Sequence, residues 1–184
     1  MPRPLVVVAH PNLARSRVNR AWADALGASG AVDVHVLGAG PVEGRIDVSA
    51  AQSLLAAHER IILQYPIHWY SAPGILHHWL EQVLERGWAY GPGGHALEGK
   101  ELGVAVSTWS TAEDYTRTGR YHRTLDELTA AFEAIAVRVG MNYLGGHFLS
   151  GIGRVTDEQL VADAGTYLAW ATARPRPPRA ENRT

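Results

Sequence analysis

Uninterrupted apolar runs, each followed by a segment of helical periodicity, constrain the fold of this chain more than any other feature. The runs PLVVVAH, RIILQYP and ELGVAVS do not alternate between apolar and polar residues, as a strand with one face in water would. Such runs are typical of strands in a parallel sheet whose two faces are both covered by helices. The pattern therefore predicts an α/β protein built around a buried parallel sheet.

Two further segments complete the predicted sheet. VDVHVL (residues 32–37) alternates and is expected to form an edge strand, and MNYLGGHFLSGI (141–152) is expected to form the last strand. Helices are expected in residues 17–30, 49–59, 73–86, 124–140 and 156–174. Five strands alternating with helices fit the order 2-1-3-4-5 of a three-layer, flavodoxin-like sandwich. In that order a ligand lies beyond the carboxyl ends of the first, third and fourth strands.

Residue types that cap helices set the expected helix ends. The expected signals are Ser16 with Gly27 or Gly30 for the first helix, a Ser49–Gln52 capping box for the second, Gly87 for the end of the third, Gly140 for the end of the fourth and Thr156 for the start of the last. Residues 1–173 are expected to form a single domain. Residues 174–184 lack apolar periodicity and are expected to form a disordered tail.

Composition argues against several classes of function. The formal net charge of −1 over 184 residues gives no electrostatic indication of a nucleic-acid or anionic-membrane partner. Because the chain contains no cysteine, disulfides, thiolate metal sites and cysteine nucleophiles are excluded. His77 and His78 are adjacent and point to different helix faces, so no metal is expected. The N-terminal apolar run is too short for a signal sequence or a membrane span, and a cytoplasmic protein is expected.

The loop after the first strand is the first candidate for ligand binding. AHPNLARSRVN runs into a helix N-terminus, where free N–H groups and the helix dipole favour an anion. Arg15, Ser16 and Arg17 add donors, although the loop has neither the glycine pattern of a dinucleotide site nor that of a P-loop. The alternative is that Ser16 only caps the helix and that the arginines are solvated.

Two more loops are expected at the same edge of the sheet. PIHWY places Trp69 and Tyr70 where ring faces and backbone N–H groups could meet a flat heterocycle. STWSTAEDYTRTGRYH offers hydroxyls for polar ring edges, followed by Tyr115 and His122 as a possible donor and acid pair. Each loop alone could be packing or an ordinary mobile segment. The three together predict a flat, phosphorylated, aromatic ligand. A separate loop, GWAYGPGG, is expected to expose its aromatics as a contact surface.

These residues resemble the NAD(P)H:quinone oxidoreductase flavoproteins, and among them the ancillary flavoproteins of glutathione-regulated potassium-efflux systems. The resemblance covers roughly residues 4–150 and rests on AHP with SRVN, QYPIHWYSAPGILHHWLEQVLERGWAYG, ALEGKELGVAVST and GMNYLGGHF. It implies an FMN-dependent NAD(P)H oxidoreductase, with FAD as a possible replacement for FMN. Such an enzyme transfers hydride by a ping-pong mechanism to quinones or similar flat acceptors.

Further residue roles are implied by the resemblance alone. The flavin phosphate and ribityl chain would contact His10, Ser16, Arg17, Val18 and Asn19, the isoalloxazine would contact Pro66, Ile67, His68, Trp69 and Tyr70, and its pyrimidine edge would contact Ser107, Thr108, Trp109 and Ser110. Tyr115 and His122 would relieve charge on the flavin, with a one-residue uncertainty in their register. The Trp88–Tyr90 loop would lie near the partner's site in a homodimer.

One departure from the family pattern concerns the loop after the fourth strand. Trp109 and Ser110 stand where relatives carry glycines, which allow a positive φ and a close approach of the backbone. Trp109 could therefore narrow the substrate slot. Two other functions remain open: a flavin-binding regulatory subunit of a potassium or cation antiporter, and an electron carrier of flavodoxin type. The near-neutral charge and the histidine and arginines in the first loop count against the carrier.

Overall fold

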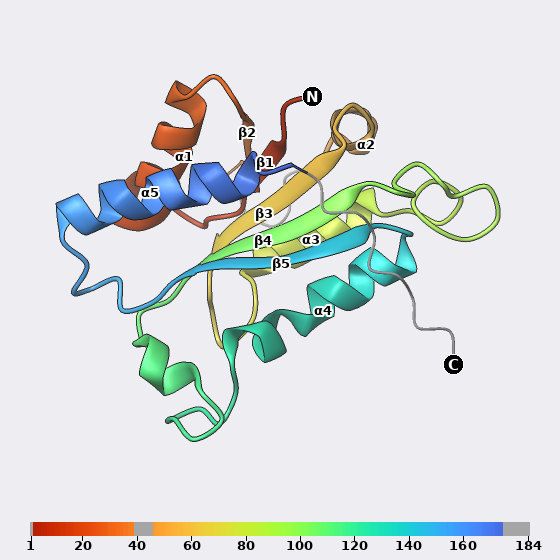
Figure 1. Cartoon of the computed structure of the whole chain (residues 1–184). Coiled ribbons are helices and arrows are strands. Elements are labelled where there is room, and N and C mark those ends of the chain that lie inside the picture. Colours follow the sequence, from red (N-terminus) through yellow and green to blue (C-terminus); the bar gives the residue numbers. More distant parts are fainter. Residues whose placement is uncertain (1, 39–45, 175–184) are drawn as a thin grey trace.

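The computed structural model describes residues 2–38 and 46–174 and contains a five-stranded parallel sheet of order β2-β1-β3-β4-β5. The strands are β1 Leu5–Val8, β2 Asp33–Val36, β3 Arg60–Pro66, β4 Glu101–Ser107 and β5 Asn142–Leu149. Figure 1 shows them as one twisted sheet that helices cover on both sides. The predicted flavodoxin-like architecture, including the strand order, is confirmed.

The helices divide between the two faces of the sheet. They are α1 Arg17–Ala28, α2 Val48–Ala56, α3 Gly74–Val83, α4 Leu125–Arg138 and α5 Asp157–Ala171, with short 3-10 helices η1 Leu13–Arg15 and η2 Ala112–Tyr115. Helices α1 and α5 pack on one face, and α2, α3 and α4 on the other. Along β1, Leu5 and Val7 join the core beneath α2–α4, whereas Val6 and Val8 join the core beneath α1 and α5. Because both faces are buried, the strand is apolar at every position.

Several helix caps form at the residues expected for them. The Ser16 side chain accepts a hydrogen bond from the Asn19 N–H at 3.2 Å, which confirms the cap of α1. Thr156 caps α5 in a reciprocal box with Gln159. After α1, Gly30 adopts a φ of 65°, so it is Gly30 and not Gly27 that follows the end of this helix.

The predicted capping box of the second helix is wrong. The cap of α2 is Asp47, whose carboxylate accepts from the Ala50 N–H at 2.9 Å. The Gln52 side chain instead donates to the Val83 carbonyl at 3.0 Å and to Glu85 at 2.9 Å. The glutamine is therefore used to tie α2 to the end of α3, a partner that is distant in the sequence.

The predicted end of the third helix is also wrong, because α3 stops at Val83 and not at Arg86. Leu84 has non-helical angles, and the chain turns so that Ala89 is buried completely. Gly87, with a φ of 90°, lies inside this turn and donates its N–H to the Tyr90 carbonyl at 2.8 Å. Burial of the turn against the core ends the helix one turn early.

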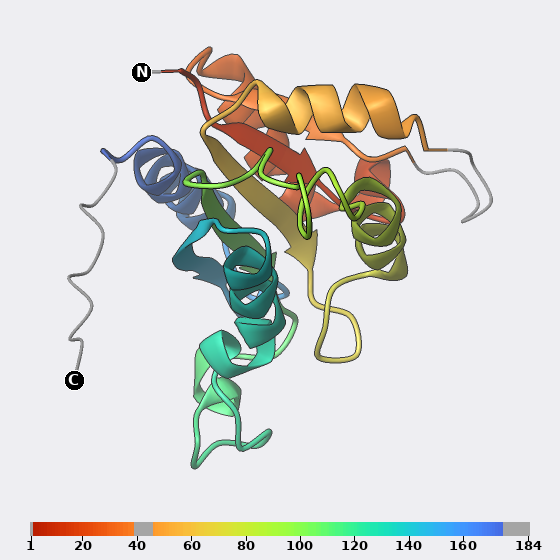
Figure 2. The ribbon, with the colours of Figure 1, turned by 90° about the vertical axis from the view of Figure 1, so that its right-hand side faces the viewer.

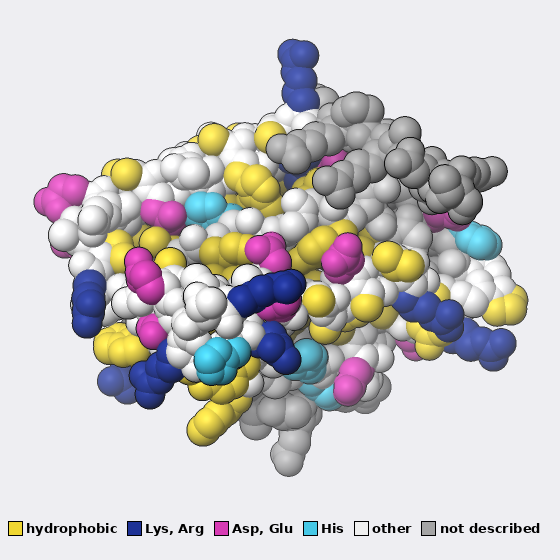
Figure 3. Space-filling view, turned by 60° about the horizontal axis from the view of Figure 1, so that its bottom comes forward, with side chains coloured by type: hydrophobic (Ala, Val, Ile, Leu, Met, Phe, Trp, Pro, Cys, Tyr) yellow, Lys and Arg dark blue, Asp and Glu magenta, His cyan; other side chains and the backbone are white. Residues whose placement is uncertain are grey.

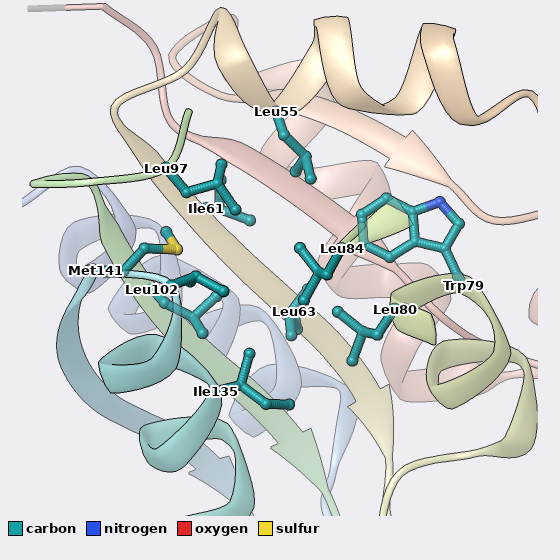
Figure 4. Close-up of a pocket in the computed structure, with 11 residues that line it drawn as sticks. Leu55, Ile61, Leu63, Trp79, Leu80, Leu84, Leu97, Leu102, Ile135 and Met141 are labelled. Carbon is teal, nitrogen blue, oxygen red and sulfur yellow. The ribbon is translucent and has the colours of Figure 1, made fainter. Parts of the chain in front are cut away.

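A small apolar hollow lies in the core between the sheet and helices α2, α3 and α4. Its volume is about 20 Å³, and Figure 4 shows the side chains that surround it, among them Leu63, Trp79, Leu102 and Ile135. No polar atom of the lining is exposed to the hollow to hold a water molecule, so the hollow is a gap in packing and not a ligand site.

Two further expectations concern the C-terminal residues and the presence of a membrane span. The predicted disordered tail falls almost entirely on residues 175–184, which lie outside the described part of the structure. In residues 2–38 and 46–174, no helix is both long and apolar enough to span a bilayer.

Candidate functional site

The loops that follow β1, β3 and β4 are joined to one another at the carboxyl edge of the sheet. The Ile67 N–H donates to the Ser107 carbonyl at 2.9 Å, and the Asn19 side-chain amide donates to the Ser107 hydroxyl at 2.9 Å. Figures 1 and 2 both show the loop after β3 and the segment between β4 and α4 extending beyond the same end of the sheet. The structure therefore brings the three predicted loops together.

In the first loop, His10 is held in one orientation. Its Nδ1 accepts a hydrogen bond from the Asn12 N–H at 3.0 Å, so in the neutral ring the proton is on Nε2. Burial lowers the pKa of His10, and the neighbouring His68 lowers it further by electrostatic repulsion. A neutral His10 thus carries its N–H donor on Nε2.

The start of α1 offers backbone donors more than side-chain donors. Within the described residues, the N–H groups of Arg17 and Val18 have no hydrogen-bond partner. The Arg17 guanidinium is engaged by Asp157 at 2.5 Å. An open hollow of about 380 Å³ adjoins this turn and is lined by Arg15, Arg20 and Asp24 among others. At the predicted anion site, the groups available to an anion are therefore two backbone N–H groups, with cationic side chains beside them.

Asn19 supports the site from below. It is buried, its carbonyl accepts from the Gln64 side chain at 2.8 Å, and its own amide is bound to Ser107. Through its backbone carbonyl and its side-chain amide, this one residue of α1 therefore connects β3 and β4 beneath the loops. This arrangement leaves little of Asn19 for direct contact with a ligand.

The loop after β3 is a strained two-residue turn. His68 and Ser71 exchange backbone hydrogen bonds of 2.8 and 3.0 Å, and between them Trp69 and Tyr70 have φ values of 47° and 64°. Non-glycine residues in such left-handed conformations cost of order 1–3 kcal/mol each, and they concentrate at functional sites. No partner for the N–H groups of Trp69 and Tyr70 exists in the described chain. The turn presents two free donors beside an indole that is 94% exposed.

In the loop after β4, some side chains are buried and others are exposed. Ser107 and Thr108 are buried, and the Thr108 hydroxyl donates to the Ser110 carbonyl at 2.8 Å. Hydrogen bonds from Gly151 to Ser110 and from Ile152 to Thr108 continue the pairing of β4 with β5 past the strand ends. The N–H groups of Trp109 and Ser110 lack partners in the part of the chain that the structure describes.

Trp109 does not need the backbone freedom of the glycines that the family pattern contains. Neither Trp109 nor Ser110 has a positive φ. The indole of Trp109 is 76% exposed and lies against Gly153, where an added Cβ would come within 3.0 Å of the ring. Trp109 and Trp69 are both too exposed to plug the space between the loops. Figure 3 shows hydrophobic side chains protruding beside Lys, Arg and His side chains on this side of the molecule.

Tyr115 and His122 lie in the segment that connects β4 to α4. Tyr115 is buried, which raises the pKa of its phenol, and hydrogen bonding with the Thr108 hydroxyl opposes the rise. His122 is exposed and has a φ of 53°. The ring that packs against Tyr115 is Tyr121, with a centroid distance of 5.0 Å. The sequence analysis assigned no role to Tyr121. The one-residue uncertainty in the register of His122 does, however, include this neighbouring position.

The Trp88–Tyr90 loop corrects an expectation. Its aromatics were expected to be exposed, but Trp88 and Tyr90 are half-buried against the core of their own chain. The Arg138 guanidinium lies 4.7 Å from the centroid of the Tyr90 ring. Ala89, between the two rings in the sequence, is buried completely in that core. In residues 2–38 and 46–174, no group of three or more His, Asp or Glu side chains is arranged to hold a metal ion.

A parallel sheet of order 2-1-3-4-5 with helices on both faces defines a flavodoxin-like protein. The chain belongs to the family described as having a flavodoxin-like fold, whose family model matches residues 2–171.

Relatives within this family cover almost the whole chain. The uncharacterized NAD(P)H oxidoreductase YdeQ of Bacillus subtilis is 38% identical over 170 residues, which are 92% of this chain and 86% of the relative. The glutathione-regulated potassium-efflux system ancillary protein KefG of Yersinia pestis is 34% identical over 170 residues, 92% of this chain and 93% of the relative. The resemblance inferred from sequence motifs is confirmed.

Two solved structures agree closely with the fold. General stress protein 14 of Treponema denticola, solved in complex with FMN, superposes with a TM-score of 0.88 at 35% identity, covering 94% of this chain and 99% of that one. An NADPH-quinone reductase from P. pentosaceus superposes with a TM-score of 0.85 at 33% identity, with the same coverage of 94% and 99%.

Proposed function

We propose that this protein is a cytoplasmic, FMN-dependent NAD(P)H oxidoreductase of the quinone reductase type. One observation carries the proposal: three loops at one edge of the sheet present N–H groups that have no partner among residues 2–38 and 46–174, next to exposed aromatic faces. The FMN complex of the relative from Treponema denticola supports it, as does the similarity to an NAD(P)H oxidoreductase and to an NADPH-quinone reductase.

The donors at this edge fit the parts of FMN. The Arg17 and Val18 amides, with His10 Nε2, would hold the phosphate, because amides at a helix N-terminus favour an anion. The turn at Trp69 and Tyr70 would hold the ring system, through its amides and ring faces. The amides of Trp109 and Ser110 would meet the polar edge of the ring. FMN, when bound, supplies hydride transfer from NAD(P)H to a flat acceptor such as a quinone, in a ping-pong order.

The protein's own side chains would orient the reactants and supply a proton donor. Because burial raises the pKa of Tyr115, its phenol stays protonated at neutral pH and can donate a hydrogen bond to charge that develops nearby. The exposed indoles of Trp69 and Trp109 provide faces on which a flat acceptor can stack. His122 would act as a second polar group only if its exposed side chain turned toward the site.

An absorbance spectrum of the purified protein, followed by anaerobic titration with NADPH, tests the proposal. We expect the absorbance bands of an oxidised flavin, their loss on titration and their return when a quinone is added. Parallel double-reciprocal plots with both substrates varied would support the ping-pong order. A protein that stays colourless after incubation with FMN and oxidises no NAD(P)H in the presence of a quinone would refute the assignment.

A homodimer is part of this proposal, with the Trp88–Tyr90 loop near the partner's site. The loop's rings are held in place by the core and by Arg138, so its outer surface is preformed for contact. Analytical ultracentrifugation should give a mass of about twice 20.0 kDa. A monomer at micromolar concentration would contradict it.

A second candidate function is that of an ancillary subunit of a cation-efflux antiporter. The similarity to KefG over 92% of this chain favours it. Co-purification with an antiporter, together with ion efflux that depends on this protein, would support that function. Efflux that is unchanged by its deletion would count against it.

A further inference from the structure

We infer that Tyr121 is a positioning residue, which clamps the strained turn after β3 to the loop after β4. The inference rests on the proposed function, because the two loops are those that would hold the flavin ring. No motif in the sequence assigns a role to this tyrosine, and the segment that contains it connects β4 to α4.

The side chain of Tyr121 contacts both loops at once. Its hydroxyl lies 2.7 Å from the Ser110 hydroxyl in the loop after β4. Its ring lies 5.0 Å from that of Tyr70 in the turn after β3, at an interplanar angle of 59°. On its other side it packs 5.0 Å from the ring of Tyr115. Tilted aromatic pairs at this distance attract each other, so Tyr121 is held between the two rings.

Tyr121 is itself anchored by backbone contacts. Its N–H donates to the Asp114 carbonyl at 3.1 Å. The Asp114 carboxylate accepts from the N–H and the hydroxyl of Thr111 at 3.0 and 3.2 Å, in a capping box that begins η2. The chain of contacts from Thr111 through Asp114 and Tyr121 therefore ends on Tyr70.

A clamp is needed because of the conformation of the turn. Trp69 and Tyr70 are in the left-handed region, which they keep only if the surroundings determine it. The two hydrogen bonds between His68 and Ser71 close the turn, but they do not set its angle to the loop after β4. Tyr121 supplies that constraint through Tyr70 and, on the other side, fixes Ser110, whose N–H is one of the free donors.

Tyr121→Phe tests this role because it removes the hydroxyl and keeps the ring. We expect faster hydrogen exchange in the apoprotein at residues 68–71 and 108–111, without a change elsewhere. The affinity for FMN should fall about fivefold, the usual effect of one lost hydrogen bond. The visible circular dichroism of the bound flavin should also change, which a general loss of stability would not produce.

Tyr143→Phe is the matched control. Tyr143 is a half-buried tyrosine near the amino end of β5, where it pairs with Leu102, at the opposite end of the sheet from the loops. The Tyr143→Phe variant should match the wild type in hydrogen exchange at the two loops, in its affinity for FMN and in the circular dichroism of the bound flavin.

A double-mutant cycle with Ser110→Ala assigns the effect to the hydroxyl pair. If the pair carries it, Tyr121→Phe with Ser110→Ala should weaken FMN binding no more than either single change. Additive losses, or unchanged exchange and affinity in Tyr121→Phe, would overturn the inference. A wild-type protein that binds no FMN would refute the proposed function, while hydrogen exchange in the apoprotein would still decide whether the clamp exists.

Discussion

Single residues at this site hold conformations or protonation states that they would not hold in an unfolded chain. His10 is the clearest case, because its environment disfavours the charged form. The ring is partly buried, and His68 from the loop after β3 approaches it from the neighbouring strand. A neutral donor at the proposed phosphate position would let an anion bind without first displacing a counter-ion from His10. A bound anion would in turn raise the pKa of His10, because it favours the protonated ring, and the two would then form an ion pair.

We predict that His10 titrates below 6.5 in the folded apoprotein and that His68→Asn raises its pKa. Removing the neighbouring charge weakens the repulsion, while burial still keeps the pKa below that of a free histidine. Nuclear magnetic resonance of the ring protons measures both values. His35 is the internal control, because burial alone lowers its pKa, and His68→Asn should leave it unchanged.

The same shift predicts the direction of a pH effect on stability. Because the pKa of His10 is lower in the folded than in the unfolded chain, the unfolded chain takes up the proton first as the pH falls. The contribution of His10 to the free energy of unfolding is therefore present above pH 6.5 and is lost as the pH falls through the folded pKa. A His10 that titrates at or above 6.5, or one that does not respond to His68→Asn, would contradict both expectations.

At the scale of elements, the loops of the site gain their shape from the strands beside them. The loop after β4 continues to pair with residues 149–152 beyond the end of β5. This pairing places Gly153 beneath the indole of Trp109. A residue without a side chain leaves room for the indole at that position. The position of Trp109 therefore depends on a turn that comes about forty residues later in the chain.

We predict that Gly153→Ala displaces Trp109. The added Cβ would lie 3.0 Å from the indole, closer than ordinary contact distance, so the ring must move. The fluorescence emission of Trp109, isolated by difference from Trp109→Phe, should shift, and the KM for the acceptor should change more than kcat. Unchanged emission and KM would show that Trp109 does not depend on Gly153.

Gly165→Ala is the control for this prediction. Gly165 lies inside α5 and has open space around an added Cβ. Alanine there should raise the free energy of unfolding by about 0.5–1 kcal/mol, because glycine is unfavourable inside a helix. It should leave the Trp109 emission as in the wild type.

At the scale of the whole molecule, two apolar cores and a few buried polar links hold the three layers together. The Arg60 guanidinium at the start of β3 binds Glu101 of β4 and donates to the Ala171 carbonyl at the end of α5, each at 2.7 Å. On the other face, the Lys100 ammonium donates to the Ala56 and His58 carbonyls at 2.9 Å. These links cross from layer to layer, whereas the small hollow under α4 marks where packing is incomplete.

We predict that Val139→Ile stabilises the fold. Val139 lines the hollow of about 20 Å³, so the added methylene can be buried without displacing a neighbour. The free energy of unfolding in urea should rise by up to about 0.8 kcal/mol. Val137→Ile is the matched control, because Val137 is 74% exposed and should give almost no change. A loss of about 1 kcal/mol or more in Val139→Ile would show that the hollow is too narrow.

Local patterns in the sequence determined the strands, most of the helices and the edge at which a ligand would bind. A strand buried on both faces must be apolar at successive positions, so β1, β3 and β4 were recognisable without knowledge of their neighbours. Parallel strands connected through helices leave few possible orders, and the rule that ligands bind at the carboxyl ends then selected three loops. The caps at Ser16 and Thr156 were predictable for the same reason, since each bonds to an amide three residues away.

Tertiary structure decided the features that depend on partners distant in the sequence. The Gln52 side chain bonds to Val83 and Glu85 and not to the start of its own helix. Helix α3 ends early because Ala89, in the turn that follows, is buried. Within the site, contacts between loops made Ser107 and Thr108 internal, left Trp109 exposed over Gly153 and set Tyr121 against Tyr115. No pattern along the chain encodes such contacts, because the energy of a packed side chain depends on which surfaces the completed fold brings beside it.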